Sequence, residues 1–377
     1  MKYYIIAGEA SGDLHASNLL KELKKLDTKA EIRAWGGDLM REQGAEIVKH
    51  YRDLAFMGFS EVIMNLRTIV KNISFCKEDI LNFKPDAIIF VDYPGFNLRI
   101  AEFAHEQKIK TFYYISPQVW AWKQSRVKKI KKVVDLMMVI LPFEKDFYKK
   151  FDYNVHFVGH PLLDAIEQQK EILLAGNDWK KRNEMEEKPL IALLPGSRTQ
   201  EISKILPLML TAIDKFPSYQ FAIAAAPSQP VEFYKSFLGN RQVKIISGET
   251  YSLLSSSDAA LVTSGTATLE TALLNIPEVV CYKGGKISYH IARRIVDIKY
   301  ISLVNLIMDK EVVKELIQDD LNEKTIFDEL QKILSEEYRK NLFSDYAELR
   351  QKLGGSGASM NAARLVFDNM STGKKMV

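Results

Sequence analysis

The stretch YYIIAGEASGDLHASNLLKELKK, residues 3–25, decides the fold class of this chain. It opens with an apolar run that predicts a buried strand over Tyr3–Ala7. Leucines recur on one face of its last part, which predicts an amphipathic helix over Ala16–Lys25. A buried strand, a glycine-bracketed loop and a helix make up the first part of a βαβ unit, so the stretch predicts a parallel α/β sheet.

Apolar runs and amphipathic stretches alternate along the rest of the chain. In the first half, further strands are expected at Glu31–Trp35, Ala87–Asp92, Lys110–Ile115, Leu136–Ile140 and Val155–Val158. Residues 176–188 lack apolar periodicity, and we interpret them as part of an interdomain connection. In the second half, strands are expected at Leu190–Leu194, Gln220–Ala225, Val243–Ile246, Ala259–Val262 and Val279–Tyr282.

This alternation predicts two Rossmann-like, doubly wound α/β domains that face a cleft, with ligands at the carboxyl ends of the strands. The domains are expected at residues 1–165 and 166–344. A glycine-rich break at 354–357 precedes a predicted closing helix. The segment 345–370 is expected to pack back onto the first domain.

Composition and charge narrow the class of protein. The 377 residues carry a net charge of +4, too small to predict nucleic-acid binding. Neither the two cysteines, Cys76 and Cys281, nor any pair of histidines has the spacing of a metal site, so we expect no bound metal. The chain shows no signal-peptide pattern and no apolar run of the roughly 18 residues that span a bilayer. These features favour a cytoplasmic protein that can still rest on a membrane surface.

One loop of the second half, LLPGSR (193–198), suits a phosphate group. It follows a predicted buried strand, and Gly196 lets the backbone approach a ligand closely. Ser197 can donate a hydrogen bond, and Arg198 supplies a planar cation that fits phosphate oxygens. An ordinary strand–turn–helix junction with a surface arginine is the alternative.

A second loop, TSGTATLE (263–270), has the same position after a strand. Ser264, Gly265 and Thr266 supply hydroxyls and free amides at a helix start, which suits a pyrophosphate. Glu270 lies about one turn into that helix and can accept hydrogen bonds from ribose hydroxyls. A solvated helix carboxylate is the alternative for Glu270, but beside LLPGSR the two loops indicate a nucleotide-diphosphate domain.

In the first half, KPDAIIFVDYPGFN (84–97) ends a predicted buried strand in Asp92. A carboxylate at this end of a parallel strand points into the cleft and can act as a general base. Asn97 is close enough in sequence to cap the following helix, and we also place it among the residues that line the cleft.

The opening loop AGEASGDLH (7–15) does not suit phosphate, because the carboxylates of Glu9 and Asp13 repel it. Ser11 and Gly12 allow a close approach, and both acids can accept hydrogen bonds from sugar hydroxyls. We therefore expect Glu9, Ser11, Gly12, Asp13 and His15 to line a sugar-binding wall of the cleft.

Two segments predict contact with lipid. In SPQVWAWKQSRVKKIKK (116–132), tryptophans precede a basic run, which suits an anionic membrane surface; a solvated basic helix is the alternative. LAFMGFSEVIMNLRTIV (54–70) is apolar and predicts core or, where exposed, a patch for acyl chains. The candidate contacts are Trp120, Trp122, Arg126, Lys128, Lys129, Phe56, Met57, Phe59 and Met64.

Taken together, these motifs resemble those of the lipid-A-disaccharide synthase family over almost the whole chain. The matching segments are GEASGD at 8–13, MGFSEV at 57–62, SPQVWAWKQSR at 116–126, LPFEK at 141–145, GHPLLD at 159–164, LLPGSR at 193–198 and SGTATLE at 264–270. Their order and spacing agree with the family, which makes the resemblance far more specific than one glycine loop.

The resemblance implies an inverting glycosyltransferase of the GT-B fold that needs no cofactor or metal. It would transfer 2,3-diacylglucosamine from UDP to 2,3-diacylglucosamine 1-phosphate, giving a β-1,6 disaccharide and UDP. This lipid A step takes place at the cytoplasmic face of the inner membrane of Gram-negative bacteria, so peripheral membrane contact is implied and a homodimer is left open. The match to SLVNL places the family's C-domain asparagine at Asn305. The resemblance also implies that the acceptor side of the cleft is formed by Glu9, Ser11, Gly12, Asp13, His15 and Asn97.

One departure from the family concerns the general base. Many members have an aspartate where this chain has Gly95, so Asp92, or else Asp13, must serve here. Alternatives are another GT-B enzyme that uses UDP-GlcNAc, either a wall glycosyltransferase or a 2-epimerase, and a non-catalytic nucleotide- or lipid-binding protein. A Rossmann dehydrogenase is disfavoured because neither half contains Gly-x-Gly-x-x-Gly.

Overall fold

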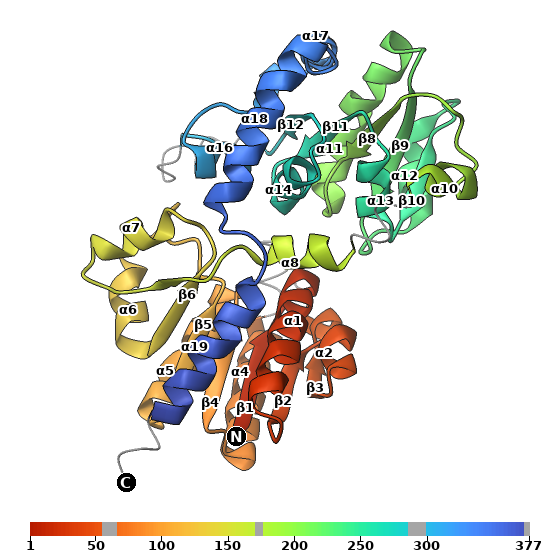
Figure 1. Ribbon diagram of the computed structural model, residues 1–377. Coiled ribbons are helices and arrows are strands. Elements are labelled where there is room, and N and C mark those ends of the chain that lie inside the picture. The colour runs from red at the N-terminus through yellow and green to blue at the C-terminus, as the bar shows by residue number, and fades with distance from the viewer. Residues whose placement is uncertain (55–65, 170–175, 286–298, 373–377) are drawn as a thin grey trace. The chain divides into compact units, whose positions relative to one another are not determined.

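The computed structural model describes residues 1–54, 66–169, 176–285 and 299–372 (Figure 1). The chain forms two compact units. The first consists of Met1–Asp164 and Leu353–Val377, and the second of Ala165–Lys352. Each unit is built on its own parallel sheet, as the alternating sequence pattern predicts.

The first unit contains a seven-stranded sheet in the order β3-β2-β1-β4-β5-β6-β7, with every neighbouring pair parallel. Its strands are β1 (Lys2–Ala7), β2 (Glu31–Gly36), β3 (Glu46–His50), β4 (Ala87–Val91), β5 (Lys110–Tyr114), β6 (Leu136–Val139) and β7 (His156–Phe157). Its helices are α1 (Ala10–Leu26), α2 (Asp38–Glu42), α4 (Leu66–Phe83), α5 (Pro94–Glu106), α6 (Arg126–Val133), α7 (Glu144–Lys149) and α19 (Ala358–Thr372), with a 3-10 turn at Tyr51–Leu54.

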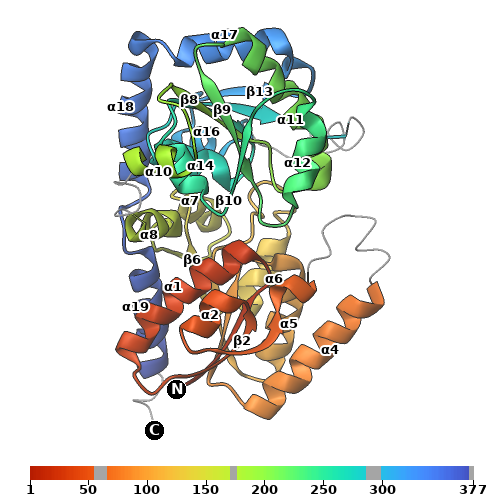
Figure 2. The same cartoon turned by 90° about the vertical axis from the view of Figure 1, so that its right-hand side faces the viewer.

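Helices α1 and α19 lie side by side on one face of this sheet (Figures 1 and 2). Leu19 and Leu23 of α1 pack with Ala362 and Val366 of α19 against Ile5 and its neighbours in the sheet. Burial of such side chains stabilises the fold by about 25 cal/mol per Å² of apolar surface. The C-terminal helix is therefore part of the core of the first unit.

The second unit contains a six-stranded sheet in the order β10-β9-β8-β11-β12-β13, again entirely parallel. Its strands are β8 (Leu190–Leu194), β9 (Gln220–Ala225), β10 (Lys244–Ser247), β11 (Ala259–Thr263), β12 (Glu278–Tyr282) and β13 (Lys314–Ile317). Its helices are α10 (Gly176–Arg182), α11 (Thr199–Met209), α12 (Val231–Leu238), α13 (Thr250–Ser255), α14 (Thr266–Leu273), α16 (Leu303–Met308), α17 (Glu323–Ile333) and α18 (Glu336–Lys352), with 3-10 turns at Leu210–Lys215 and Gln318–Asp320.

Two sequence-based expectations about the domain limits differ from the structure. The segment 176–188 is not simply a connection, because α10 buries Trp179 in the second unit, where its indole N–H donates to Glu249 at 2.7 Å. The chain re-enters the first unit at Leu353 rather than at residue 345, since α18 packs on α14, α16 and α17. The edge strands β3 and β13 were not expected, because neither stands out as an apolar run.

The chain leaves and re-enters the first unit at one hydrogen-bonded junction. Helix α8 (Pro161–Gln168) begins there, and its Asp164 carboxylate accepts the amides of Gly357 at 2.5 Å and Ser359 at 2.8 Å. Gly159 has φ +92°, and a Cβ added to it would touch Ala358 at 3.5 Å. The GHPLLD motif therefore serves to fasten the start of α19.

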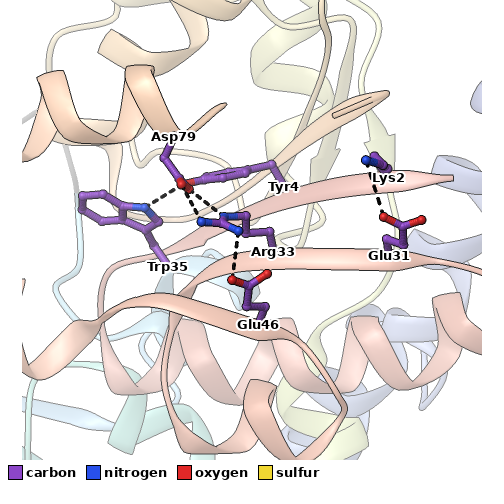
Figure 3. Close-up of polar contacts among 7 residues, drawn as sticks. All are labelled: Lys2, Tyr4, Glu31, Arg33, Trp35, Glu46 and Asp79. Carbon is purple, nitrogen blue, oxygen red and sulfur yellow. Dashed lines mark hydrogen bonds and ion pairs between the residues drawn. The ribbon is translucent and has the colours of Figure 1, made fainter. Parts of the chain in front are cut away.

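A buried polar cluster attaches α4 to the other face of the first sheet (Figure 3). The Asp79 carboxylate accepts the Tyr4 hydroxyl at 2.7 Å and the Arg33 guanidinium through Nε at 3.0 Å and Nη2 at 2.7 Å. The Trp35 indole N–H donates to the Tyr4 hydroxyl at 2.8 Å. The polar side chains of the cluster therefore satisfy one another's hydrogen bonds, which is the condition for a stable polar cluster inside a protein.

Replacing Asp79 by alanine is expected to lower the free energy of unfolding by about 3 kcal/mol, because the Arg33 charge loses its buried partner. The measurement is urea unfolding followed by the fluorescence of the tryptophans. Glu31→Ala is the matched control: its carboxylate lies 3.6 Å from the Lys2 ammonium on the exposed surface (Figure 3), and we expect a loss below about 0.5 kcal/mol. Equal losses in the two variants would contradict the role given to the cluster.

Among the described residues, no helix is long and apolar enough to cross a membrane. Cys76 and Cys281 are both buried, and neither forms a disulfide.

Candidate functional site

Two acidic residues leave neighbouring strands at the carboxyl edge of the first sheet. Glu9 follows β1 and precedes α1, and Asp92 follows β4. The two strands pair directly, with Ala7 opposite Val91. Glu9 is exposed, whereas Asp92 is half-buried. This edge is where a doubly wound sheet binds its ligands, so the first sheet presents a carboxylate pair at that position.

The backbone at Asp92 is held in an uncommon conformation. Asp92 and Tyr93 have φ values of 47° and 48°, the left-handed region that side chains other than glycine rarely adopt. The Asp92 carbonyl accepts the Tyr113 hydroxyl at 2.6 Å and the Asn97 amide at 2.7 Å. The Tyr93 ring fills the space where Gly8 lacks a side chain. Consecutive strained residues cost roughly 1–3 kcal/mol each and cluster at functional sites.

The environment of Asp92 also changes its acidity. Burial, and after it the negative charge of Glu9, raise the pKa of Asp92 to about 6, although a hydrogen bond from the Tyr93 backbone opposes both effects. A carboxylate that titrates close to neutral pH can accept and release a proton under physiological conditions. Asp92 is therefore suited to the role of general base that its position in the sequence predicts.

The other polar residues expected on the acceptor side differ in their placement. Ser11 is exposed, but Asp13 is buried, and its carboxylate accepts the amides of Gly37 at 2.7 Å, Leu39 at 3.2 Å and Met40 at 3.3 Å. These bonds satisfy the free amides at the start of α2. Asp13 thus holds α2 in place. We expected its carboxylate to bind the acceptor, but it is buried and already bonded within the protein.

Three further residues of the predicted acceptor set are also buried. Gly12 lets α1 approach Ala7, since an added Cβ would lie 3.3 Å from the Ala7 side chain. Asn97 is fully buried, and its amide bonds to the Asp92 carbonyl rather than projecting from the site. Burial lowers the pKa of His15 to about 4 and that of His160 to about 3, so both rings are neutral packing groups.

In the second unit, the loop after β8 has the features expected of LLPGSR. Gly196 has φ +111°, and an added Cβ would lie 2.9 Å from the Glu201 carboxylate and 3.3 Å from Thr263. Arg198 is exposed at the N-terminus of α11, and its guanidinium donates to Glu201 at 3.2 Å. Only glycine fits the first position, and an exposed, oriented arginine at a helix N-terminus is suited to an anion.

The loop after β11 lies beside it, because β8 and β11 are adjacent in the sheet. Gly265 precedes α14, which begins at Thr266, and the Ser264 hydroxyl donates to the Ile301 carbonyl at 2.9 Å. Glu270 of α14 accepts the Tyr251 hydroxyl at 2.9 Å. Burial raises the pKa of Glu270, and the bond from Tyr251 opposes the shift. The structure therefore brings the two predicted phosphate loops together at one sheet edge.

Asn305 lies behind these loops instead of in them. It is fully buried, and its amide oxygen accepts the Val312 and Val313 amides at 2.8 and 3.0 Å. Its amide nitrogen donates to Glu315 at 2.9 Å, and Glu315 in turn accepts the Ile301 amide at 3.0 Å. Because Ile301 also accepts the Ser264 hydroxyl, Asn305 supports the second phosphate loop from inside the unit. Sequence reasoning did not find Glu315 or Tyr251, whose partners lie far away in the chain.

Some of the predicted lipid-contact residues are buried, and others are exposed. Trp120 is 9% exposed and packs edge-on against Phe143, with 4.9 Å between the ring centroids. Trp122 is 43% exposed, and the cations of Lys123 and Arg126 lie 4.4 and 5.5 Å from its ring. Trp120 is thus part of the core, and Trp122 remains at the surface.

The basic helix that follows Trp122 buries only its apolar side. Helix α6 buries Val127, Ile130 and Val133 and leaves Lys128 and Lys129 exposed. Lys129 pairs with Glu102 at 2.5 Å. The four predicted acyl contacts Phe56, Met57, Phe59 and Met64 lie outside the described residues. Helix α4, which follows them, exposes the large apolar side chains of Val70, Phe75 and Leu81.

One buried carboxyl of this region escaped the sequence analysis. Glu144, in LPFEK, accepts the amides of Leu141 at 2.9 Å and Ile140 at 3.2 Å at the end of β6. Burial raises the pKa of Glu144 to about 7, against the opposing effect of the Leu141 amide. Glu144 therefore orders the loop after β6. Among residues that the structure describes, no group of three or more histidines, cysteines and acids could hold a metal ion.

Comparison with protein families gives a match over nearly the whole chain. Residues 3–366 match the family described as "Lipid-A-disaccharide synthetase". Proteins named lipid-A-disaccharide synthase are similar: that of Coxiella burnetii (strain Dugway 5J108-111) is 36% identical over 370 residues, 97% of both chains, and that of Syntrophus aciditrophicus (strain SB) is 38% identical over 367 residues, 95% of both chains.

Solved structures with a similar fold come from more distant proteins. A UDP-GlcNAc 2-epimerase from Neisseria meningitidis, bound to UDP-GlcNAc, aligns with a TM-score of 0.65 at 15% identity, covering 99% of this chain and 100% of the other. The glycotransferase of kitacinnamycin aligns with a TM-score of 0.63 at 11% identity and covers 98% of each chain. These similarities show that the chain has the GT-B fold, and they carry no information about its substrate.

Proposed function

This chain belongs to the lipid-A-disaccharide synthase family, and on that basis we propose the substrates and residue roles of its reaction. It is a GT-B glycosyltransferase that forms the lipid A disaccharide. The proposed donor is UDP-2,3-diacylglucosamine, and the proposed acceptor is 2,3-diacylglucosamine 1-phosphate. The acceptor 6-hydroxyl attacks the anomeric carbon from the side opposite UDP, so the new β-1,6 bond forms as the bond to the pyrophosphate breaks.

The second unit is assigned to the donor. The Arg198 guanidinium and the free amides near Thr266 bind the pyrophosphate and stabilise the negative charge that grows on the departing UDP. Gly196, Ser197, Ser264 and Gly265 allow the backbone to approach these oxygens. Glu270 accepts hydrogen bonds from the ribose hydroxyls, and Asn305 positions the second loop through Glu315.

The first unit is assigned to the acceptor, with Asp92 as the general base. Its carboxylate takes the proton of the 6-hydroxyl during the attack. The observation that supports this role is the strained, half-buried turn that places Asp92 beside Glu9 and raises its pKa to about 6. Glu9 and Ser11 are the exposed groups left to contact the sugar, while Asp13 and Asn97 hold the framework around them.

Two further roles are proposed at the level of the whole protein. The chain rests on the cytoplasmic face of the inner membrane, where both lipid substrates are found, and it does not bind nucleic acid. A homodimer is compatible with these roles. Support for membrane contact comes from exposed Trp122 beside the lysines of α6, since an aromatic edge next to a cationic helix favours an anionic bilayer surface.

The assay that tests the function uses purified protein with UDP-2,3-diacylglucosamine and the acyl sugar 1-phosphate, without added metal. We expect a disaccharide 1-phosphate and one UDP for each bond formed. A 2-epimerase is the second candidate, favoured by the likeness of fold to the Neisseria meningitidis enzyme. Interconversion of UDP-GlcNAc at C2 with no disaccharide would contradict the proposed substrates.

The membrane role predicts a charge effect. Reversing Lys128 and Lys129 to glutamate is expected to weaken binding to vesicles that contain an anionic phospholipid by about tenfold or more, because each basic residue near such a surface contributes about 1 kcal/mol. Cosedimentation with vesicles measures the loss. The control is reversal of exposed Lys324 and Lys340 in the second unit. Unchanged binding of the α6 variant would contradict the membrane role and show that α6 is an ordinary solvated basic helix.

A further inference from the structure

The turn that carries Asp92 is held from the neighbouring strand. The Asp92 amide donates to the Tyr114 carbonyl at 3.2 Å, so the pairing of β4 with β5 continues up to this residue. At φ 47° the chain then turns away from the sheet, and the Asp92 carbonyl accepts the Tyr113 hydroxyl at 2.6 Å and the Asn97 amide at 2.7 Å. Two side-chain donors therefore satisfy this carbonyl at the point where the strand ends.

Tyr113 is a rigidly placed donor. It lies in β5 opposite Phe90 of β4, it is fully buried, and its ring packs against that of Phe90 with 5.7 Å between the centroids. Burial, and after it the charge of Asp92, raise the pKa of the Tyr113 hydroxyl well above its usual value, so the hydroxyl keeps its proton at physiological pH. A side chain locked by packing on a strand fixes the group that it contacts more tightly than a loop residue can.

Asn97, the second donor, has several tasks. Its amide nitrogen also lies 3.4 Å from the Ile6 carbonyl and 3.5 Å from the Val91 carbonyl, so it ties α5 to β1 and β4 as well as to the turn. A hydroxyl has one proton to donate, and that of Tyr113 goes to the Asp92 carbonyl. The Tyr113 hydroxyl can therefore be removed from the turn while the other contacts of this edge stay in place.

We propose that Tyr113 is a positioning residue for the reaction and that it acts through Asp92. This inference rests on the proposed role of Asp92 as general base. Since the left-handed conformation is unfavourable for a residue with a side chain, the turn depends on the bonds to its carbonyl. Without the Tyr113 hydroxyl the turn relaxes, and the carboxylate spends less time within reach of the acceptor hydroxyl.

The variant that tests this role is Tyr113→Phe, which removes one oxygen atom and keeps the ring that packs on Phe90. We expect kcat to fall by about 10–100-fold, because a displacement of about 1 Å in a reacting group can cost about 10²-fold in rate. KM for both substrates should stay within about twofold of wild type, because the groups proposed to bind them are unchanged.

The pH profile provides a readout that a loss of stability alone would not move. A carboxylate that moves away from Glu9 and toward water loses both causes of its raised pKa. The acidic limb of kcat/KM should therefore lie at lower pH in Tyr113→Phe than in the wild-type protein. Initial rates of disaccharide formation between pH 4.5 and 8, roughly the range in which such a carboxyl titrates, measure the shift.

The matched control is Tyr153→Phe. The Tyr153 hydroxyl also donates to a backbone carbonyl of the first unit, that of Val134 at 3.1 Å, but this bond precedes β6 at the opposite edge of the sheet. We expect its kcat and its pH profile to equal those of the wild-type protein. Circular dichroism confirms that both variants fold. Equal losses of kcat in the two variants would overturn the positioning role.

Combining Tyr113→Phe with Asp92→Asn separates this inference from the proposed function. If Tyr113 acts through Asp92, the double variant should be as slow as Asp92→Asn alone. A further loss in the double variant, or an unchanged kcat and pH profile in Tyr113→Phe, would overturn the positioning role and leave Asp92 as the base. Full activity of Asp92→Asn would instead contradict the base itself, and the positioning role with it.

Discussion

Replacing Asp92 by asparagine is expected to lower kcat by about 10²–10⁴-fold, the range that a positioned general base contributes. The amide keeps the shape of the side chain and the hydrogen bonds to the Asp92 carbonyl, so the turn should stay folded. KM for the donor should change little, because Arg198 and the second unit are untouched. Initial rates of disaccharide formation at saturating substrate measure the effect. Full activity of the variant would contradict the assignment.

The pH profile tests the same residue independently of mutation. The base must be ionised, so kcat/KM should fall as the pH drops through about 6, the pKa to which burial and Glu9 raise Asp92. Removing the charge in Glu9→Gln takes away a cause of that increase. The acidic limb of the profile should therefore move to lower pH. A shift to higher pH, or none, would show that another group controls the rate.

Gly95 offers a way to test the departure from the family pattern. A Cβ added at Gly95 meets no atom within 4 Å, so an aspartate fits there without strain at the start of α5. A carboxylate in the first turn of a helix is also favourable. We expect Gly95→Asp to restore part of the activity in the Asp92→Asn background. Restoration would show that either position can deliver the base to the acceptor.

Arg198→Ala is expected to reduce kcat by roughly 10²–10³-fold, the loss seen when one preorganised group that stabilises transition-state charge is removed. The guanidinium is exposed, held only by Glu201, and contributes little to the core, so the fold should be unaffected. Arg198→Lys should recover only part of the loss, because an ammonium cannot bind two oxygens in a planar fork. Steady-state rates and calorimetric binding of UDP separate the effect on catalysis from that on binding.

The control for Arg198 is Arg241→Ala. Arg241 also lies at the surface of the second unit and pairs with one carboxylate, that of Asp214, at 3.0 Å. It lies far from LLPGSR in sequence, beyond the C-terminus of α12. Its loss should leave kcat within about twofold of wild type, because a surface ion pair contributes about 0–1 kcal/mol to stability and nothing to the reaction. Equal losses in both variants would argue against a donor-binding role for Arg198.

The strands, the two sheets and the residues at the ends of β4, β8 and β11 were predictable from sequence, because their signals are local. An apolar run followed by a glycine loop marks a strand that enters a ligand edge, whether at Asp92, at Gly196 or at Gly265. The edge strands β3 and β13 were missed, since half-exposed strands carry a weak apolar signal. The packing of α10 on the second unit was missed because it depends on one buried side chain, that of Trp179, and a single apolar residue gives no periodic pattern in the sequence.

What the sequence by itself determined is therefore the fold class, the family and the loops that carry the chemistry. Only the tertiary structure decided which polar residues of those loops are available. Asp13, Asn97 and Asn305 have side chains of the kind that binds a ligand, yet each is buried and bonded within the protein. Asp13 accepts the amides of α2, Asn97 donates to the Asp92 carbonyl, and Asn305 accepts the amides that precede β13. A hydrogen-bond partner can come from any part of a folded chain, whereas a hydrophobic period repeats within a few residues. The roles of the polar side chains therefore depend on the tertiary structure, whereas the positions of the buried apolar side chains can be predicted from the sequence.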